Sequence, residues 1–131
     1  MELRVSRSAL AALAAHAAAA APDECCGLLL GPADRVTIAQ STANVAPGPR
    51  RQFEIDPQAL VDAHRAARAG GPQVLGYYHS HPGGAAMPSA TDQALASGDG
   101  RVWAIVGAGG VEFWLDGAQG FTPLSYVAVD G

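Results

Sequence analysis

Two histidines and an aspartate in this sequence have the types and the spacing of a reactive site. His79-Ser80-His81 is followed by a loop rich in proline and glycine and then by Ser89-Ala90-Thr91-Asp92. The apolar run before His79 predicts a buried strand, in which side chains two apart share a face. His79 and His81 would therefore project together. Two imidazoles and one carboxylate are a three-ligand set for a catalytic zinc ion, with water in the fourth position.

Each part of this motif also has an ordinary structural explanation. A single histidine is usually structural, and a serine three residues before an aspartate is common at a helix N-terminus. From average residue usage, the whole pattern from His79 to Asp92 should arise by chance in on the order of one in several thousand such chains. The combination, and not any single residue, therefore predicts a metal site.

A further carboxylate, Glu24, opens the apolar run of residues 24–31, which predicts a second buried strand. Glu24 would share a face with Cys26, Leu28 and Leu30. A carboxylate at the mouth of such a strand is costly unless it has a partner or a task. Taken alone, however, Glu24 is better explained as the last exposed residue of the preceding turn. Cys26 is better explained as a small buried residue than as a neighbour of the metal.

The elements that must position these side chains follow from capping and periodicity. Helices are predicted from Ser6 or Ser8 to about Ala21, from Asp56 to about Ala69, and from Ser89 to about Ser97. Besides the two strands above, further strands are predicted at residues 1–5, 35–44, 101–108, 110–115 and 124–129. Strands interleaved with three helices predict an α/β (α+β) fold, a mixed β-sheet flanked by about three helices.

Composition limits the classes of protein to consider. A chain of 131 residues is expected to form a single domain, residues 1–131. Its hydrophobic content of 49% with only 15% charged residues is typical of a globular chain. The net charge of −4 gives no electrostatic footprint for nucleic acid, and no apolar run is long enough to span a bilayer.

The two cysteines and the N-terminal segment bear on the compartment. Cys25 and Cys26 are adjacent, so a disulfide between them is improbable on geometry, and reduced thiols suit a cytoplasmic protein. Residues 1–21 loosely resemble a secretory signal. Against that, the segment uses alanine where a signal favours leucine, and Glu2 and His16 interrupt it. We therefore expect a cytoplasmic protein.

The motif also resembles that of a known family. Glu24, His79-Ser80-His81-Pro82 and Ser89-Ala90-Thr91-Asp92 together resemble the motif of the JAMM/MPN+ (JAB1/MPN/Mov34) zinc metalloproteases, in their short prokaryotic form. Residues 22–31 look like the segment that carries the family's glutamate, and residues 44–46 and 53–56 also resemble short prokaryotic members. The resemblance covers nearly the whole chain, with no departure at a motif position.

This resemblance implies a role for each residue. His79, His81 and Asp92 would be the ligands of one Zn²⁺ ion, with a water molecule as the fourth ligand. Glu24 would be the general acid/base, and Ser89 would hydrogen-bond the oxyanion of the tetrahedral intermediate. It also implies an MPN-type domain of cytidine-deaminase-like architecture.

The implied activity is that of a deubiquitinase-like isopeptidase. Family members hydrolyse peptide or isopeptide bonds at the C-terminus of ubiquitin-like proteins. The loops at residues 46–52 and 81–89 are short, so the insertions with which larger relatives grip ubiquitin chains are absent. We therefore expect a metallopeptidase that processes a ubiquitin-like sulfur-carrier protein. A zinc amidohydrolase or peptidase acting on small substrates, and a non-catalytic MPN-type scaffold, remain alternatives, and a homo-oligomer is left open.

Overall fold

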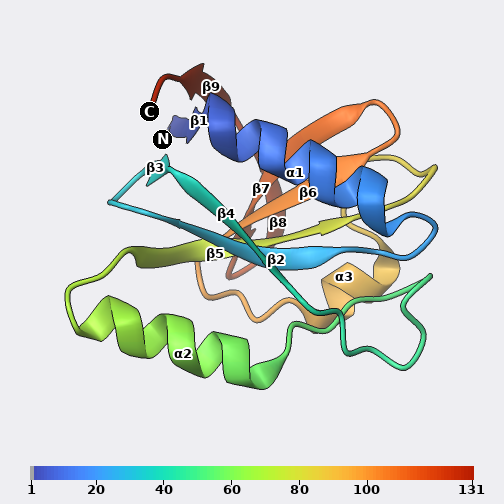
Figure 1. The fold of residues 1–131 in the computed structure, drawn as a ribbon. Coiled ribbons are helices and arrows are strands. Elements are labelled where there is room, and N and C mark those ends of the chain that lie inside the picture. Colours follow the sequence, from blue (N-terminus) through green and yellow to red (C-terminus); the bar gives the residue numbers. More distant parts are fainter. Residues whose placement is uncertain (1) are drawn as a thin grey trace.

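The computed structural model describes residues 2–131, and these form two β-sheets and three α-helices (Figure 1). The strands are β1 (Leu3–Ser6), β2 (Cys26–Gly31), β3 (Arg35–Val36), β4 (Ile38–Thr42), β5 (Gln73–Ser80), β6 (Val102–Gly107), β7 (Gly110–Gly117), β8 (Gly120–Leu124) and β9 (Tyr126–Val129). The helices are α1 (Arg7–Ala20), α2 (Pro57–Arg68) and α3 (Ala90–Leu95).

The larger sheet has six strands in the order β4-β2-β5-β6-β7-β8. β2 pairs antiparallel with β4 and β5, whereas β5 pairs parallel with β6, so the sheet is mixed. The register of β2 and β5 places Cys26 opposite His79. β2 and β5 thus bring the segment that begins at Glu24 next to the histidines. The predicted α/β fold with a mixed sheet and three helices is confirmed.

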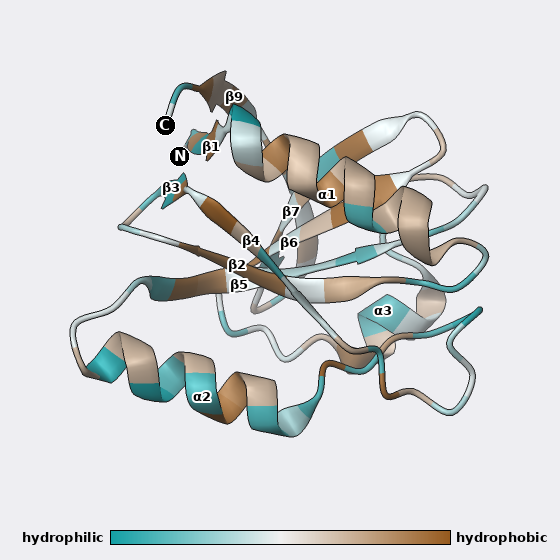
Figure 2. Cartoon of the chain, in the orientation of Figure 1, coloured by the Kyte–Doolittle hydropathy of each residue, from teal (hydrophilic) through white to brown (hydrophobic). Residues whose placement is uncertain are grey.

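Helices α1 and α2 lie on opposite sides of this sheet (Figure 1). On the α1 side, Leu13 packs in a core cluster with Leu29 and Tyr78, while α2 covers a second cluster formed by alternate residues of β2. Figure 2 shows hydrophobic residues along β2 and β5 between the helices, whereas hydrophilic residues recur along α2. Among residues 2–131, no helix is both long and apolar enough to cross a membrane.

Helix α2 begins at its predicted cap, Asp56, and α1 begins at Ser6, one of the two caps predicted for it. The Ser6 hydroxyl accepts the N–H of Ala9 at 3.1 Å, and the Asp56 carboxylate accepts the N–H of Gln58 at 3.0 Å. These side-chain oxygens satisfy backbone donors that have no partner inside the helix.

Two strands predicted as continuous are each divided between the sheets. Residues 35–44 form β3 and β4, and residues 124–129 end β8 and then form β9. β3 and β9 pair with β1 in a separate three-stranded sheet of order β3-β1-β9. Alternation within one segment does not tell which strand it pairs with, so the second sheet was not predicted.

Helix α3 is shorter than predicted, ending at Leu95 instead of near Ser97. The buried carboxylate of Asp116 accepts the N–H groups of Ser97 and Gly98 at 3.2 and 3.1 Å. These amides are therefore held by β7 and do not continue the helix. α3 is left as a short support for Asp92.

Candidate metal centre

Three side chains from β5, the residue after it and α3 converge in a compact triangle. The Nε2 atoms of His79 and His81 are 3.1 Å apart. The Oδ2 atom of Asp92 lies 3.0 Å from His79 Nε2 and 3.2 Å from His81 Nε2. His79 and Asp92 are buried, and His81 is half-buried. Strand alternation explains the pairing of the histidines, and the turn into α3 delivers the carboxylate.

Glu24 joins this cluster from the segment just before β2, since that strand begins at Cys26, two residues later than predicted. Its carboxylate and the ring nitrogens of His79 and His81 all lie within 4.8 Å of one another. Its side chain is buried, with 8% of the residue exposed. The simpler explanation of Glu24 as an exposed turn residue is therefore wrong.

The two histidines are oriented in different ways. The Nδ1–H of His81 donates to the carbonyl oxygen of Ala85 at 2.9 Å, because a carbonyl can only accept, and Nε2 keeps its lone pair towards the cluster. His79 Nδ1 is buried and has no hydrogen-bond partner among the described residues. Instead, Phe53 stacks on the His79 ring at 4.2 Å between centroids, and Trp103 meets it edge-on at 5.7 Å.

The electrostatic environment differs between these imidazoles. Burial lowers the pKa of His79, although its hydrogen bond to Asp92 opposes that effect. The hydrogen bond to Asp92 raises the pKa of His81, with burial opposing it. His79 is thus held in the neutral form that binds metals.

Asp92 and Ser89 form a reciprocal cap at the start of α3. The Ser89 N–H donates to Asp92 Oδ2 at 3.0 Å, and the Asp92 N–H donates to the Ser89 hydroxyl oxygen at 3.0 Å. The Ser89 hydroxyl hydrogen therefore remains free to donate elsewhere. Burial alone would raise the pKa of Asp92, but hydrogen bonds with His79, His81 and the Ser89 backbone outweigh it and lower the pKa. The carboxylate is ionised and oriented.

The pKa of Glu24 is shifted in the opposite direction to that of Asp92. Burial raises the pKa of Glu24 to about 7, with His81 opposing the shift and Asp92 adding to it. Two carboxylates in one cluster therefore differ in proton affinity, because Asp92 receives hydrogen bonds and Glu24 is desolvated.

The donor set fits a zinc ion. Zinc holds histidine nitrogens and carboxylate oxygens at about 2.0–2.2 Å in tetrahedral geometry, which separates neighbouring ligand atoms by about 3.3–3.5 Å. The triangle of His79, His81 and Asp92 has sides of 3.0 to 3.2 Å, close to the face of such a tetrahedron. The Glu24 carboxylate lies beside this face, within 4.8 Å of both ring nitrogens.

The loop after His81 is anchored to β6 and β7. Trp114 Nε1 donates to the Ala86 carbonyl oxygen at 3.1 Å, and the Ala108 N–H donates to that of Gly84 at 2.8 Å. A Cβ on Gly107 would lie only 2.6 Å from the Ala86 nitrogen, so glycine is needed for this close approach. The same loop supplies the Ala85 carbonyl that orients His81.

Sequence reasoning missed several residues that support the cluster. Nothing in the local sequence of Trp114 marks its hydrogen bond to Ala86. Phe53 and Asn44 fall in segments that resemble the short prokaryotic family, but without an assigned role. Cys26, as expected, is buried, with its thiol directed at the carbonyl oxygens of Ala43 and Glu54 and not at the histidines.

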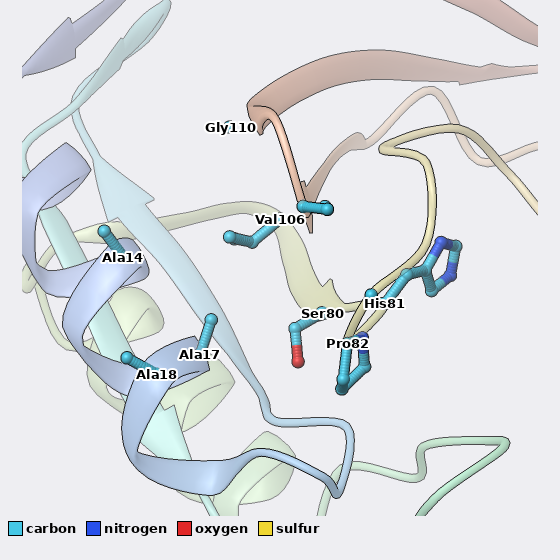
Figure 3. A pocket seen from close by; sticks show the side chains of 11 residues that line it. Ala14, Ala17, Ala18, Ser80, His81, Pro82, Val106 and Gly110 are labelled. Atoms are coloured by element: carbon cyan, nitrogen blue, oxygen red, sulfur yellow. The ribbon is translucent and has the colours of Figure 1, made fainter.

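A pocket of about 330 Å³ lies between α1 and the end of β5. Figure 3 shows Ser80 on the side of the α1 alanines, whereas the His81 ring points away from them. The Ser80 hydroxyl accepts the Cys25 N–H at 2.9 Å and so connects β5 to the residue before β2. Of the cluster of His79, His81 and Asp92, His81 alone also lines this pocket.

The comparison with protein families identifies the family of this chain. Residues 6–116 match the model of the prokaryotic homologs of the JAB domain. The chain belongs to this family. The expected resemblance to the JAMM/MPN+ proteins is thereby confirmed.

Two curated proteins are similar to this JAB-family chain. One, named desampylase, from Haloferax volcanii, is 43% identical over 64% of this chain and 62% of its own length, so the chain spans less than two thirds of that relative. The other, from Thermus thermophilus, is named a probable TtuB-protein conjugate cleaving protease. It is 37% identical over 86% of this chain and 75% of its own length.

A solved structure agrees with the fold. A protein from Desulfitobacterium hafniense, determined in solution, superposes with a TM-score of 0.87 and is 27% identical. The match covers 98% of this chain and 94% of that one. The two proteins therefore share the fold along nearly the entire JAB-family chain.

Proposed function

We propose that this chain is a zinc-dependent metallopeptidase that cleaves a peptide or isopeptide bond at the C-terminus of a ubiquitin-like sulfur-carrier protein. The observation that carries the proposal is the triangle of His79, His81 and Asp92 with the Glu24 carboxylate beside it. The three close donors suit the role of metal ligands, and the more distant Glu24 carboxylate suits the role of a proton carrier. His79, His81 and Asp92 would hold the zinc ion.

When bound, zinc supplies polarisation of the scissile carbonyl and lowers the pKa of water towards about 7. The protein's own residues supply the proton transfers. Glu24, buried at the edge of the cluster, would accept a proton from the attacking water and deliver it to the departing amine. Its carboxylate is not fixed by a side-chain hydrogen bond to Asp92 or the histidines, which leaves it free to take and release that proton.

Ser89 would act on the developing negative charge. Its hydroxyl oxygen already accepts the Asp92 N–H, so the hydroxyl hydrogen is the donor that remains. A donor held by a helix cap requires little reorganisation during the reaction. Ser89 would thus serve both as a cap and as an oxyanion donor.

The substrate class is supported by the relatives and by the shape of the protein. The Thermus relative is named for cleaving TtuB-protein conjugates, and the Haloferax relative is named desampylase. A shallow apolar pocket of about 210 Å³, lined in part by Phe53, Leu95 and Trp103, adjoins the cluster. An extended C-terminal tail needs such an open approach, and the short loops at residues 46–52 and 81–89 do not enclose it.

We further propose a cytoplasmic location. Cys25 and Cys26 are free and buried, and burial raises the pKa of both thiols. Thiols of this kind persist in a reducing compartment.

The test uses the purified full chain loaded with one equivalent of zinc. A ubiquitin-like sulfur carrier fused through its C-terminus to a reporter peptide should be cleaved at the junction. Glu24→Gln should reduce turnover by at least about 100-fold while retaining zinc, because only the proton carrier is removed. Full activity of Glu24→Gln would contradict the assigned mechanism.

Two further results would favour the alternatives. Cleavage of short peptides or small amides at rates equal to those of the carrier fusion would favour a broad peptidase or amidohydrolase. A chain without measurable zinc affinity would favour a non-catalytic scaffold.

A further inference from the structure

Asn44 occupies an unusual position between β4 and α2. It lies in the irregular segment of residues 43–56 and is half-buried, with a single isolated β-bridge to Ile55. Although its sequence neighbourhood resembles the short prokaryotic family, neither the metal ligands nor the proposed proton carrier account for an asparagine here. Its hydrogen bonds do.

All hydrogen-bonding positions of the Asn44 side chain are used. Its Nδ2 group donates to the backbone carbonyl oxygens of Glu24 at 2.9 Å and Gln52 at 3.1 Å. Its Oδ1 atom accepts the backbone N–H groups of Ala46 and Glu54, each at 3.0 Å. A side-chain amide offers two donor hydrogens and two acceptor lone pairs, so Asn44 is saturated.

The same segment also holds the other side of the Glu24 backbone. The Glu24 N–H donates to the Pro49 carbonyl oxygen at 2.7 Å. Both backbone polar groups of Glu24 are therefore bound by residues 44–49, one directly and one through the Asn44 amide. Because Glu24 precedes β2, these two bonds, and not the sheet ladder, fix where its side chain begins.

The segment reaches the metal ligands as well. Phe53 lies one position before Glu54, which is bonded to Asn44, and its ring stacks on His79 with the ring centroids 4.2 Å apart. Asn44 thus connects the backbone of the proposed proton carrier to a segment in contact with a proposed ligand.

We infer that Asn44 is a positioning residue for Glu24, holding its backbone so that the carboxylate stays beside the His79–His81–Asp92 triangle. This inference rests on the proposed function for its catalytic consequence, but its structural content can be tested without activity. A displacement of about 1 Å in a catalytic group can cost about 100-fold in rate. Loss of the Asn44 donors should therefore reduce kcat more than it affects zinc binding.

The deciding variant is Asn44→Asp. It retains an oxygen that accepts from Ala46 and Glu54 and removes both donors, to Glu24 and to Gln52. Asn44→Ser removes the same two amide donors without adding a charge, and it replaces Asn44→Asp if the latter does not fold. The matched control is Val45→Ala, because Val45 is 45% exposed and its side chain has no group that forms hydrogen bonds.

Two measurements are made on each zinc-loaded variant. The Glu24 N–H donates to Pro49 and not to Asn44, so its exchange reports how firmly residues 44–49 hold Glu24. In Asn44→Asp and Asn44→Ser this exchange should be faster than in the wild type by about tenfold, because the free energy of opening the segment falls by about one net hydrogen bond, while Leu28 in β2 is unchanged. With the carrier fusion, kcat should fall by about 10- to 100-fold, with KM and bound zinc unchanged. Val45→Ala should match the wild type in both measurements.

The other outcomes are equally decisive. Unchanged Glu24 exchange in Asn44→Asp and Asn44→Ser would overturn the inference, as would a loss of zinc that parallels the loss of kcat, since Asn44 would then support the ligands. If the wild type does not hydrolyse the fusion, the proposed function fails, and Glu24 exchange alone decides the role of Asn44.

Discussion

Phe53 stacks on the imidazole of His79, with ring centroids 4.2 Å apart and planes inclined by 17°. Because His79 Nδ1 has no hydrogen-bond partner among the described residues, aromatic packing takes over the orienting role that such a partner usually has. Phe53→Ala should therefore weaken zinc binding by about tenfold or more. Phe53→Tyr keeps the ring and should bind zinc like the wild type. Competition with a chromogenic chelator measures both, and equal affinity of Phe53→Ala would show that packing does not orient His79.

Asp92 is predicted to matter for the metal more than for the fold. In Asp92→Asn the amide oxygen can still accept the Ser89 N–H, so the cap of α3 is retained. The ionised ligand is lost, and zinc affinity should fall by more than about 100-fold, beyond the range typical of residues that only support a ligand. Thermal unfolding of the metal-free variant should stay near that of the wild type. A large loss of metal-free stability with intact zinc affinity would reverse this assignment.

Ser89 is predicted to have two separable roles. Ser89→Ala removes the acceptor for the Asp92 N–H, which should destabilise the protein by about 1 kcal/mol. It also removes the hydroxyl donor, which should lower kcat by about 100- to 1000-fold with the carrier fusion. Ser89→Thr retains both functions and should recover most of the rate. If Ser89→Ala loses stability but no activity, Ser89 is a cap alone.

Gly107 offers a test of how the loop of residues 81–89 supports the centre. In Gly107→Ala, the new Cβ would lie 2.6 Å from the Ala86 nitrogen and 2.8 Å from the Gly84 oxygen, so the loop must shift. We expect a loss of about 1–3 kcal/mol in the free energy of unfolding and weaker zinc binding. Gly109→Ala is the matched control, because a Cβ there meets nothing within 4 Å. Denaturant unfolding and zinc titration should separate these two neighbours.

His16 predicts a pH dependence of stability away from the metal centre. His16 Nδ1 lies 2.7 Å from the Tyr78 hydroxyl oxygen, and burial lowers the pKa of His16 from its ordinary value of 6.5. The unfolded chain therefore binds a proton more readily than the folded one, so stability is lost as pH falls below about 6.5 and levels off below the folded-state pKa. His16→Gln should lose less stability than the wild type over this interval. If the free energy of unfolding fell by the same amount in both proteins over this pH interval, the prediction would be contradicted.

The family and the close grouping of the cluster residues were accessible from the sequence because they depend on local geometry. Alternation in a strand places His79 and His81 together, and one helical turn brings Asp92 back to Ser89. The helix cap Asp56 was predicted for the same reason, and so was Ser6 as one of two candidate caps. Such relationships span a few residues, so spacing is enough to specify them.

Other features depended on contacts between distant segments. A carboxylate just before a strand does not by itself indicate a site. Glu24 joins the cluster only because β2 pairs with β5, which places Glu24 beside His79, 55 residues further along the chain. Division of residues 124–129 between two sheets likewise followed from pairing with β1. Neither partner is encoded in the pattern of the segment itself.

The sequence by itself thus determined which residues could hold a metal and to which family the chain is similar. Only the tertiary structure decided what holds those residues in place: Phe53 against His79, the Asn44 amide on the Glu24 carbonyl, and Trp114 on the loop after His81. The physical reason is that ligand spacing follows from backbone periodicity, whereas these supports are side-chain contacts between segments that folding alone brings together.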